Sequence, residues 1–271
     1  RWMHPTEYSQ FLKRWTEKFD PEQIWLKEAG STAPTESAIR QDWQKNVPLS
    51  TPEFDRHARI LRNQTQAGLI YRLLSGLDTF EDTVRVTTQM AENALDASLA
   101  HHRVILDSAF GAPSNPALTI LGMGKLGGRE LNLSSDIDIF CVFAEDGETS
   151  GPRVRDHGDY FTRLTQQLAK SLDALTVDGF VARVDQRLRP WGSAGQLAIP
   201  VVACEDYYEV HGREWERFAL LKARPVAGDR DLGTNLLDSL KPFMYRKYLD
   251  FGVFESIRDL KSKIETEVRR N

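Results

Sequence analysis

The sequence is poor in cysteine. Its 271 residues include only Cys141 and Cys204, which stand in unrelated parts of the chain. Two scattered cysteines form neither a disulfide framework nor a cysteine-based zinc site, and they suit a reducing compartment. We therefore predict a cytoplasmic protein without structural disulfides.

Long apolar runs and an excess of positive charge are also missing. No segment approaches the roughly 20 apolar residues that cross a bilayer, and no signal peptide is visible, so we expect no membrane partner. Lysine and arginine number 35 against 39 aspartate and glutamate, and 35 − 39 gives a net charge of −4. This balance disfavours nucleic acid as the main partner.

Helical patterns dominate both ends of the chain. They are clear over 51–76 and over the long segment that follows, which we expect Asp78 to cap with Glu81 as its capping-box partner. The breaker-rich run GAPSNP (111–116) closes this part. We predict three regions: a helical amino-terminal region (1–116), a catalytic core (117–201) and a helical flank packed on that core (202–271). The chain begins without Met and ends within a helical pattern, so we expect a piece of a longer protein.

The stretch 118–143, LTILGMGKLGGRELNLSSDIDIFCVF, carries the strongest chemical signal. An apolar run that ends in glycines indicates a buried strand followed by a tight turn. The closing segment alternates, so in a strand Asp136 and Asp138 project from one face while Ile137 and Ile139 anchor the other. Two carboxylates on one face repel each other unless a cation lies between them. Oxygen ligands beside a glycine-rich loop predict Mg²⁺ that holds a phosphate chain.

A second alternating segment, FVARVDQRLRP (180–190), supplies a third carboxylate. One face of the predicted strand is shared by Val181, Arg183, Asp185 and Arg187. We predict that Asp185 joins Asp136 and Asp138 as a ligand of one or two Mg²⁺ ions. In the plainer interpretation, Asp185 only pairs with Arg183 or Arg187, and an isolated D-x-D is a solvated rim.

The remaining patterns complete an α+β fold. An amphipathic helix over 154–175 is expected to cover one face of the sheet, and 196–201 is expected to form a short edge strand. From Glu205 to the end the pattern is helical again. We therefore predict a small mixed sheet with substantial helical regions on both sides of it in the chain.

These residues resemble the nucleotidyltransferase superfamily, whose polymerase-beta-like core has this architecture. Gly124 stands twelve residues before Asp136, where the superfamily places its first glycine, and Ser135 precedes the D-x-D as it commonly does. Lys125 stands where the superfamily usually has serine, and this departure points to one branch. The runs GMGKLGGRELNLSSDIDIF, DGFVARVDQRLRPWGSAG and GREWERFALLKARPVAGD closely resemble the bienzymes that adenylylate and deadenylylate bacterial glutamine synthetase. The resemblance covers about residues 60–271.

The resemblance implies a reaction and its participants. Members of that family carry two nucleotidyltransferase copies, and the phrases DYYEVHGREWERFALLKARPVAGD and PFMYRKYLDF resemble the amino-terminal, deadenylylating copy. In that copy inorganic phosphate attacks the AMP–tyrosine bond of glutamine synthetase and yields ADP. The PII signalling protein and glutamine would regulate the intact chain. Because phosphate is itself a nucleophile, no strong general base is required.

The loop before the D-x-D is the expected phosphate site. Backbone N–H groups over 124–128 would face phosphate, and Gly124, Gly127 and Gly128 let that backbone approach closely. Ser135 completes this predicted nucleotide-binding segment. In the plainer interpretation, the glycine pair at 127–128 only permits a turn.

Bringing phosphate next to an anionic phosphodiester requires cations. Our candidates are Lys125, Arg187 and Arg189, and the weaker candidates are Lys222 and Arg224. Arg187 and Arg189 differ by two positions and share a face of the predicted strand, although they could also be structural ion-pair partners. Lys222 and Arg224 lie in a charged segment where a solvated face is the default.

Two other functions stay open at this point. One is adenylyl transfer from ATP to the same tyrosine, which releases pyrophosphate in place of ADP. The other is a non-catalytic module whose nucleotide site only senses ligands. The complete set of carboxylates argues against a mere sensor, because a sensor would tolerate the loss of one.

Overall fold

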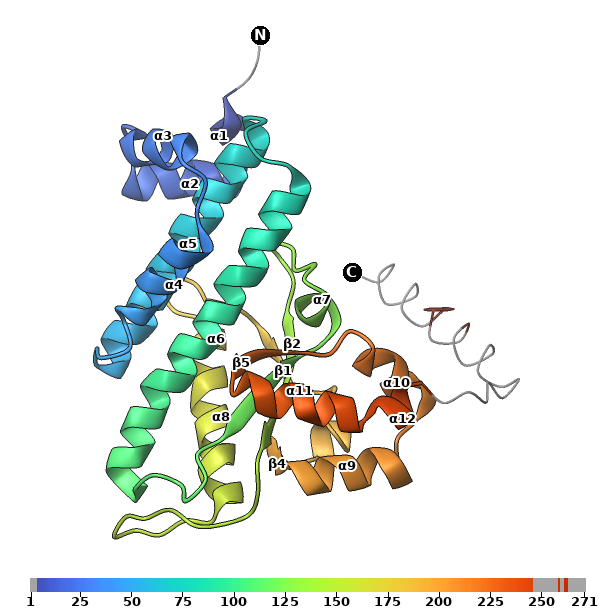
Figure 1. Ribbon diagram of the computed structural model, residues 1–271. Coiled ribbons are helices and arrows are strands. Elements are labelled where there is room, and N and C mark those ends of the chain that lie inside the picture. The colour runs from blue at the N-terminus through green and yellow to red at the C-terminus, as the bar shows by residue number, and fades with distance from the viewer. Residues whose placement is uncertain (1–3, 246–257, 259–260, 263–271) are drawn as a thin grey trace.

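A computed structural model describes residues 4–245, 258 and 261–262. It consists of long helices packed on a small mixed sheet, which confirms the predicted α+β class (Figure 1). Within the described residues, no helix is long and apolar enough to cross a membrane. The helical pattern predicted over 246–271, and with it most of the phrase PFMYRKYLDF, lies largely outside the described residues.

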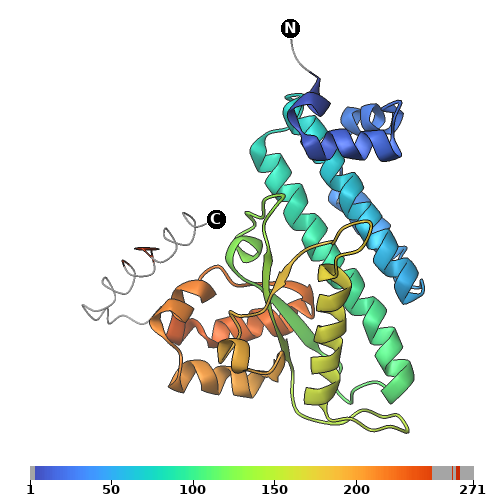
Figure 2. The same cartoon turned by 180° about the vertical axis from the view of Figure 1, so that it is seen from behind.

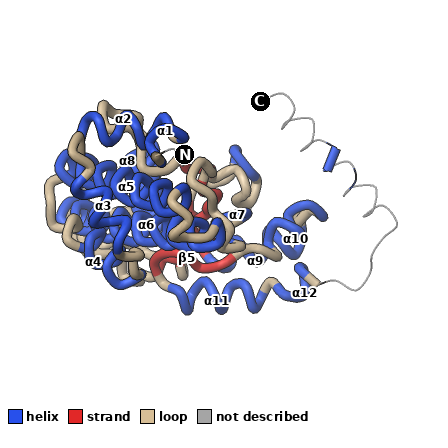
Figure 3. Tube along the Cα trace, turned by 90° about the horizontal axis from the view of Figure 1, so that it is seen from above, coloured by secondary structure: helices blue, strands red, loops and turns tan. Residues whose placement is uncertain are grey.

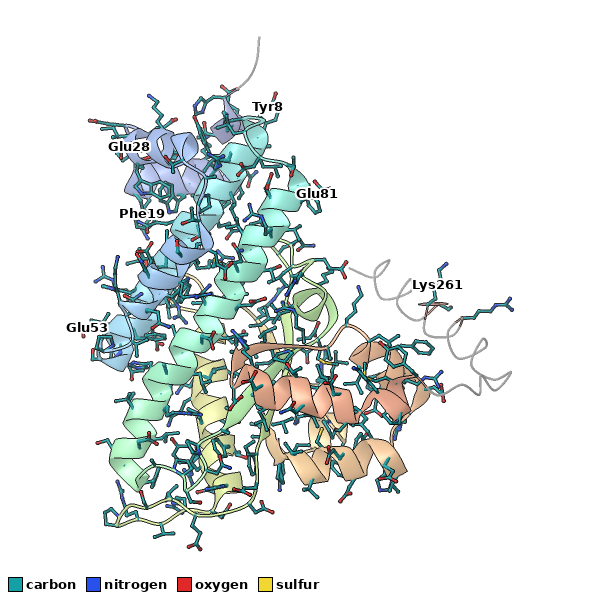
Figure 4. All side chains as sticks on the ribbon, viewed as in Figure 1. Tyr8, Phe19, Glu28, Glu53, Glu81 and Lys261 are labelled. Carbon is teal, nitrogen blue, oxygen red and sulfur yellow. The ribbon has the colours of Figure 1, made fainter. Side chains whose placement is uncertain are left out.

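The amino-terminal region is built on a pair of long helices. Its elements are α1 (Pro5–Tyr8), α2 (Gln10–Phe19), α3 (Ile24–Ser31), α4 (Glu36–Gln44), α5 (Thr51–Leu74) and α6 (Phe80–Phe110). Glu53 and Glu81 lie in the first turns of α5 and α6 and at opposite ends of the pair, so the two helices are antiparallel (Figure 4). The short helices α1 to α3 gather at the end where α5 stops and α6 begins (Figure 1).

The predicted cap of α6 is wrong by one residue. Thr79 is the N-cap: its hydroxyl accepts from the backbone N–H of Asp82, and the Asp82 carboxylate accepts from the backbone N–H of Thr79, both at 3.1 Å. Asp78 is engaged elsewhere, because Arg72 donates to it at 2.6 Å and both side chains are 9% exposed. Sequence spacing alone could not separate these two acceptors, since both precede the helix.

The sheet has the order β3-β2-β1-β5, and β4 also pairs with β2. Its strands are β1 (Leu118–Gly122), β2 (Ile137–Phe143), β3 (Val184–Asp185), β4 (Ala198–Pro200) and β5 (Arg224–Gly228). β1 runs antiparallel to β2 and β5, whereas β3 and β4 run parallel to β2 at its two ends. The predicted strand over 180–190 is confined to the two residues of β3.

β5 corrects the prediction that 202–271 is helical throughout. It pairs with β1 at the edge of the sheet and contains Pro225, which an edge strand tolerates because its outer side needs no backbone donor. The flank therefore supplies a strand to the core as well as helices. These helices are α9 (Val201–Val210), α10 (Glu214–Leu220), α11 (Arg230–Ser239) and α12 (Lys241–Met244).

Helices cover both faces of the sheet. Alternation along β2 places Ile137 and Ile139 in the core shared with α6 and with α8 (His157–Asp173), while Phe140 and Val142 face the core shared with α9 and α11. Figure 2 shows α8 on the same side as α5 and α6, and from above β5 lies between α6 and α11 (Figure 3). α8 is shorter than the predicted 154–175.

We expect His102 to make this fold sensitive to acid. Burial lowers the pKa of His102 from 6.5 to about 4, with a smaller contribution from the charge of His101. The unfolded chain then binds more protons between these two values, so stability falls as the pH drops from about 6.5 toward 4. His102→Leu removes this titration. As the pH falls from 6.5 to 4, the unfolding free energy of the wild type should therefore drop by roughly 2–3 kcal/mol more than that of the variant.

Urea unfolding at a series of pH values measures this difference. His4→Leu, at an exposed position, is the control and should follow the wild-type slope. Parallel curves for wild type and His102→Leu between pH 6.5 and 4 would contradict the prediction.

Candidate active site

Two parallel strands place two of the predicted carboxylates side by side. In the β2–β3 pairing, Asp138 lies opposite Asp185, and Ile137 lies opposite Val184. Asp136 directly precedes β2 at the same end of the sheet. The topology therefore brings Asp185 close to two acids that precede it by almost fifty positions in the chain.

The glycine loop that follows β1 lies directly beside Asp138. After β1, α7 (Gly124–Gly127) begins at Gly124, whose φ of +50° lies in the left-handed region. A Cβ atom at this position would lie 2.8 Å from Asp138 Oδ2. The neighbouring Met123 N–H donates to the Asp138 carbonyl at 2.8 Å. Glycine is needed at position 124 both for the backbone conformation and for this close approach.

The electrostatics of the cluster favour a bound cation. Burial raises the pKa of Asp138, and the charges of Asp185 and Asp136 raise it further. The pKa of Asp185 is lowered, chiefly by its hydrogen bond with Arg187. Asp138 is thus a partly buried carboxylate whose nearest acidic neighbours repel its charge. Carboxylate oxygens with excess negative charge are the donor set that Mg²⁺ prefers, so these residues fit that ion.

Two arginines form ion pairs with Asp136 and Asp185, the acids on either side of Asp138. Arg183 Nε lies 2.5 Å from Asp136 Oδ1, and Arg187 Nη2 lies 2.5 Å from Asp185 Oδ2. With the acids held in this way, no three acidic, histidine or cysteine side chains in the described part of the chain are arranged to hold a metal ion. The metal role of the three acids therefore stays a prediction, and the arginines supply positive charge in this conformation.

The predicted cations fall into two groups. Lys125 Nζ donates to Ser135 Oγ at 3.2 Å, and Ser135 lies just before Asp136 and the start of β2. Arg187 is largely exposed. Arg189 is only 8% exposed, and its guanidinium donates to the carbonyls of Gln186, Ser193 and Gly195 at 2.7–3.1 Å. The prediction that Arg187 and Arg189 share a face is therefore wrong, because the chain leaves β3 after Asp185 and turns around Arg189.

Lys222, Arg224 and the glycine pair have local partners. Lys222 pairs with Glu130. Arg224 pairs with Glu92 of α6 and donates to the carbonyls of Leu126 and Gly127 at 3.2 Å, so it fastens the end of α7. Gly127 is buried, and a Cβ atom there would lie 2.1 Å from the Lys222 carbonyl. Close packing requires glycine at position 127, and its role at a phosphate stays a prediction.

Sequence patterns missed Arg183 and Glu92 as members of this region. The sequence pattern offers Arg183 as a partner for Asp185, whereas the parallel register sets it beside Asp136. Aligning Ile137 with Val184 would have revealed this pair. Glu92 is linked to α7 through Arg224, which follows it by 132 positions in the chain, and no local signal marks it.

Comparison with known proteins identifies the family. A family model described as glutamate-ammonia ligase adenylyltransferase matches residues 7–239. The chain belongs to the glutamate-ammonia ligase adenylyltransferase family. Bifunctional glutamine synthetase adenylyltransferase/adenylyl-removing enzymes are 44% identical to it in Thioalkalivibrio sulfidiphilus (strain HL-EbGR7) and 47% identical in Hahella chejuensis (strain KCTC 2396). These matches cover 90% and 82% of this chain but 25% and 24% of the relatives, so the chain spans about a quarter of their length.

In this member of the glutamate-ammonia ligase adenylyltransferase family, Gly124→Ala should damage the site in a defined way. The new methyl group would displace the Asp138 carboxylate, because only 2.8 Å separates the two positions. A displacement of about 1 Å in a reacting group can cost 10²-fold in rate, so we expect turnover to fall ten- to a hundredfold. Steady-state kinetics of nucleotidyl transfer measures it.

Gly76→Ala is the matched control for this substitution. Gly76 has a φ of +69°, and nothing lies within 4 Å of the added Cβ position. Both variants should lose roughly 1–2 kcal/mol of stability from the left-handed backbone, but only Gly124→Ala should lose turnover. Equal turnover in the two variants would show that contact with Asp138 does not matter.

Proposed function

We propose that this chain catalyses Mg²⁺-dependent removal of AMP from adenylylated glutamine synthetase, with inorganic phosphate as the attacking group and ADP as the product. Family membership supports the protein substrate, because the relatives are named for acting on glutamine synthetase. The run from Asp206 to Asp229 supports the adenylyl-removing half, since it resembles the amino-terminal copy. Regulation of the intact chain by the PII protein and glutamine belongs to the same proposal.

The observation that carries the proposal is the pairing of Asp138 with Asp185 beside Gly124. A glycine loop directly against paired carboxylates provides room for phosphate next to hard oxygen ligands. Asp136, Asp138 and Asp185 are the residues that would hold Mg²⁺. When bound, this ion would offset negative charge on the phosphate oxygens as the transfer proceeds.

The reaction also requires cationic side chains that hold two anions close together. A P–O bond forms between phosphate and the AMP phosphorus, and the bond from that phosphorus to the tyrosine oxygen breaks. The proton of HPO₄²⁻ passes to the tyrosine oxygen, so the products are ADP and neutral tyrosine and no separate base is consumed. Two anions must approach each other, and Lys125 and Arg187 are the exposed cations that favour the ionised form of Asp138. We propose that these two residues hold the anions.

The deciding experiment mixes the protein with adenylylated glutamine synthetase, Mg²⁺ and inorganic phosphate. We expect phosphate-dependent formation of ADP and loss of AMP from the tyrosine. Pyrophosphate released from ATP with unmodified glutamine synthetase would instead indicate adenylyl transfer. Absence of both reactions, with nucleotide still bound, would favour a sensing module.

A further inference from the structure

A pocket of about 220 Å³ lies between the long helices and the segments that lead into β2 and β3. Its apolar wall includes Leu69 of α5, Met90 and Ala91 of α6, Ile137 of β2 and Phe180. Ile137 faces this pocket, and alternation turns Asp138 away from it, toward the other face of the sheet. The pocket therefore lies on the other side of β2 from Asp138, although Ser135 and Arg183, which lie beside the carboxylate cluster, also line it.

Arg62 is the unusual residue in the pocket lining. Burial lowers the pKa of its guanidinium, and the polar contact described for it is with the neutral Asn63 Oδ1 at 3.0 Å. The guanidinium stands over the ring of Phe180 at 5.4 Å. Among the residues that the structure describes, no carboxylate forms an ion pair with Arg62. A partly buried cation without a counter-ion is unfavourable, so the pocket suits an anion.

Arg183 links this pocket to the carboxylate cluster. It also lines the pocket, and its guanidinium lies 6.0 Å from the centre of the Phe180 ring that Arg62 contacts. At the same time it donates to Asp136 at 2.5 Å and to the Ser134 carbonyl at 3.3 Å. An anion in the pocket would therefore compete with Asp136 for Arg183.

We propose that this pocket binds a small organic carboxylate with an apolar body, and that binding draws Arg183 away from Asp136. The volume limits the ligand, because pockets for drug-sized molecules measure about 300–1,000 Å³. The carboxylate lies between Arg62 and Arg183, and the apolar body fills the space between α5 and α6. Once released by Arg183, Asp136 is available as a metal ligand, so the ligand tightens divalent-cation binding on the other face of the sheet.

The first test measures binding of 4-methylpentanoate by calorimetry and uses 4-methylpentanamide as its neutral control. We expect saturable binding of the acid and none of the amide. Arg62→Gln should weaken binding on the order of tenfold, as expected for the loss of a charged hydrogen bond, whereas Arg56→Gln, at an exposed position on α5, should leave it unchanged. Equal binding of acid and amide by the wild type would overturn the proposal without relying on any variant. So would undiminished binding by Arg62→Gln.

The second test measures Mn²⁺ affinity by electron paramagnetic resonance, with and without 4-methylpentanoate. We expect the acid to tighten Mn²⁺ binding about fivefold or more, the lower range of typical coupling between sites. Arg183→Gln should bind Mn²⁺ tightly without the acid and show no further response. An unchanged Mn²⁺ affinity would overturn the coupling. Absence of Mn²⁺ binding in every sample would overturn the coupling together with the proposed metal site, while the pocket itself is decided by the first test.

Discussion

Asp138→Asn is expected to lower the turnover of the proposed AMP removal by on the order of 10²–10³-fold while the fold survives. The substitution keeps the shape of the side chain but removes the charge at the centre of the cluster formed with Asp185 and Asp136. Loss of one preorganised electrostatic contact in an active site typically has an effect of this size. ADP formation at saturating phosphate measures it, and circular dichroism shows whether the fold persists.

The same variant should be more stable than wild type at neutral pH when no divalent cation is present. The pKa of folded Asp138 is raised above its ordinary value of 3.8, so the folded protein disfavours the ionised form. The stability that this group contributes is complete below pH 3.8 and is lost as the pH rises through the folded pKa. Asparagine cannot ionise, so its advantage should be present at pH 7 and should vanish in acid below pH 3.8.

Thermal unfolding with added Mg²⁺ tests the same site in the opposite direction, because a bound cation should favour the wild type. If Mg²⁺ binds the proposed site, it should raise the midpoint of thermal unfolding of the wild type, because only the folded chain forms that site, whereas Asp138→Asn should respond weakly. Asp146→Asn removes one charge from an exposed loop after β2 and is the control, with wild-type turnover and a wild-type response to Mg²⁺. If Asp138→Asn retained near-normal turnover and the same response to Mg²⁺, Asp138 would not belong to a metal site.

The predictions that succeeded rest on local patterns. The alternation from Asp136 to Ile139 required only the short-range geometry of a strand. Burial of Ile137 and Ile139 follows from the same alternation. Local periodicity likewise predicted the long helices, because each presents an apolar face to the core.

The predictions that failed depend on ion pairs and strand pairings that the local pattern does not encode. Asp78 does not cap α6, because Arg72 claims its carboxylate in a buried ion pair. β5 forms because it pairs with the edge of β1, and the sequence of 224–228 alone does not predict that pairing. The position of Arg183 beside Asp136 likewise follows from the register of two strands almost fifty residues apart.

Arg189 is a residue of the candidate site whose contacts the sequence did not predict. Its replacement should cause the largest loss of stability. Its guanidinium donates to three backbone carbonyls of the turn over 186–195, and the side chain is 8% exposed. Arg189→Met keeps the length of the side chain but leaves those carbonyls without their donor. Hydrogen bonds from a charged donor contribute about 1.5–3 kcal/mol each, and the three made by Arg189 are partly buried, so we expect the unfolding free energy to fall by roughly 3–5 kcal/mol in urea titrations.

Arg187→Met is the matched control, because it removes an arginine two positions away that is largely exposed and bound to Asp185. An exposed ion pair contributes little to stability, so this variant should stay within about 0.5 kcal/mol of wild type and lose affinity for phosphate instead. Equal destabilisation by the two substitutions would mean that the turn does not depend on Arg189. The expected contrast would assign the two arginines of one R-L-R motif to different tasks: Arg189 holds the turn that follows Asp185, and the exposed Arg187 binds an anion.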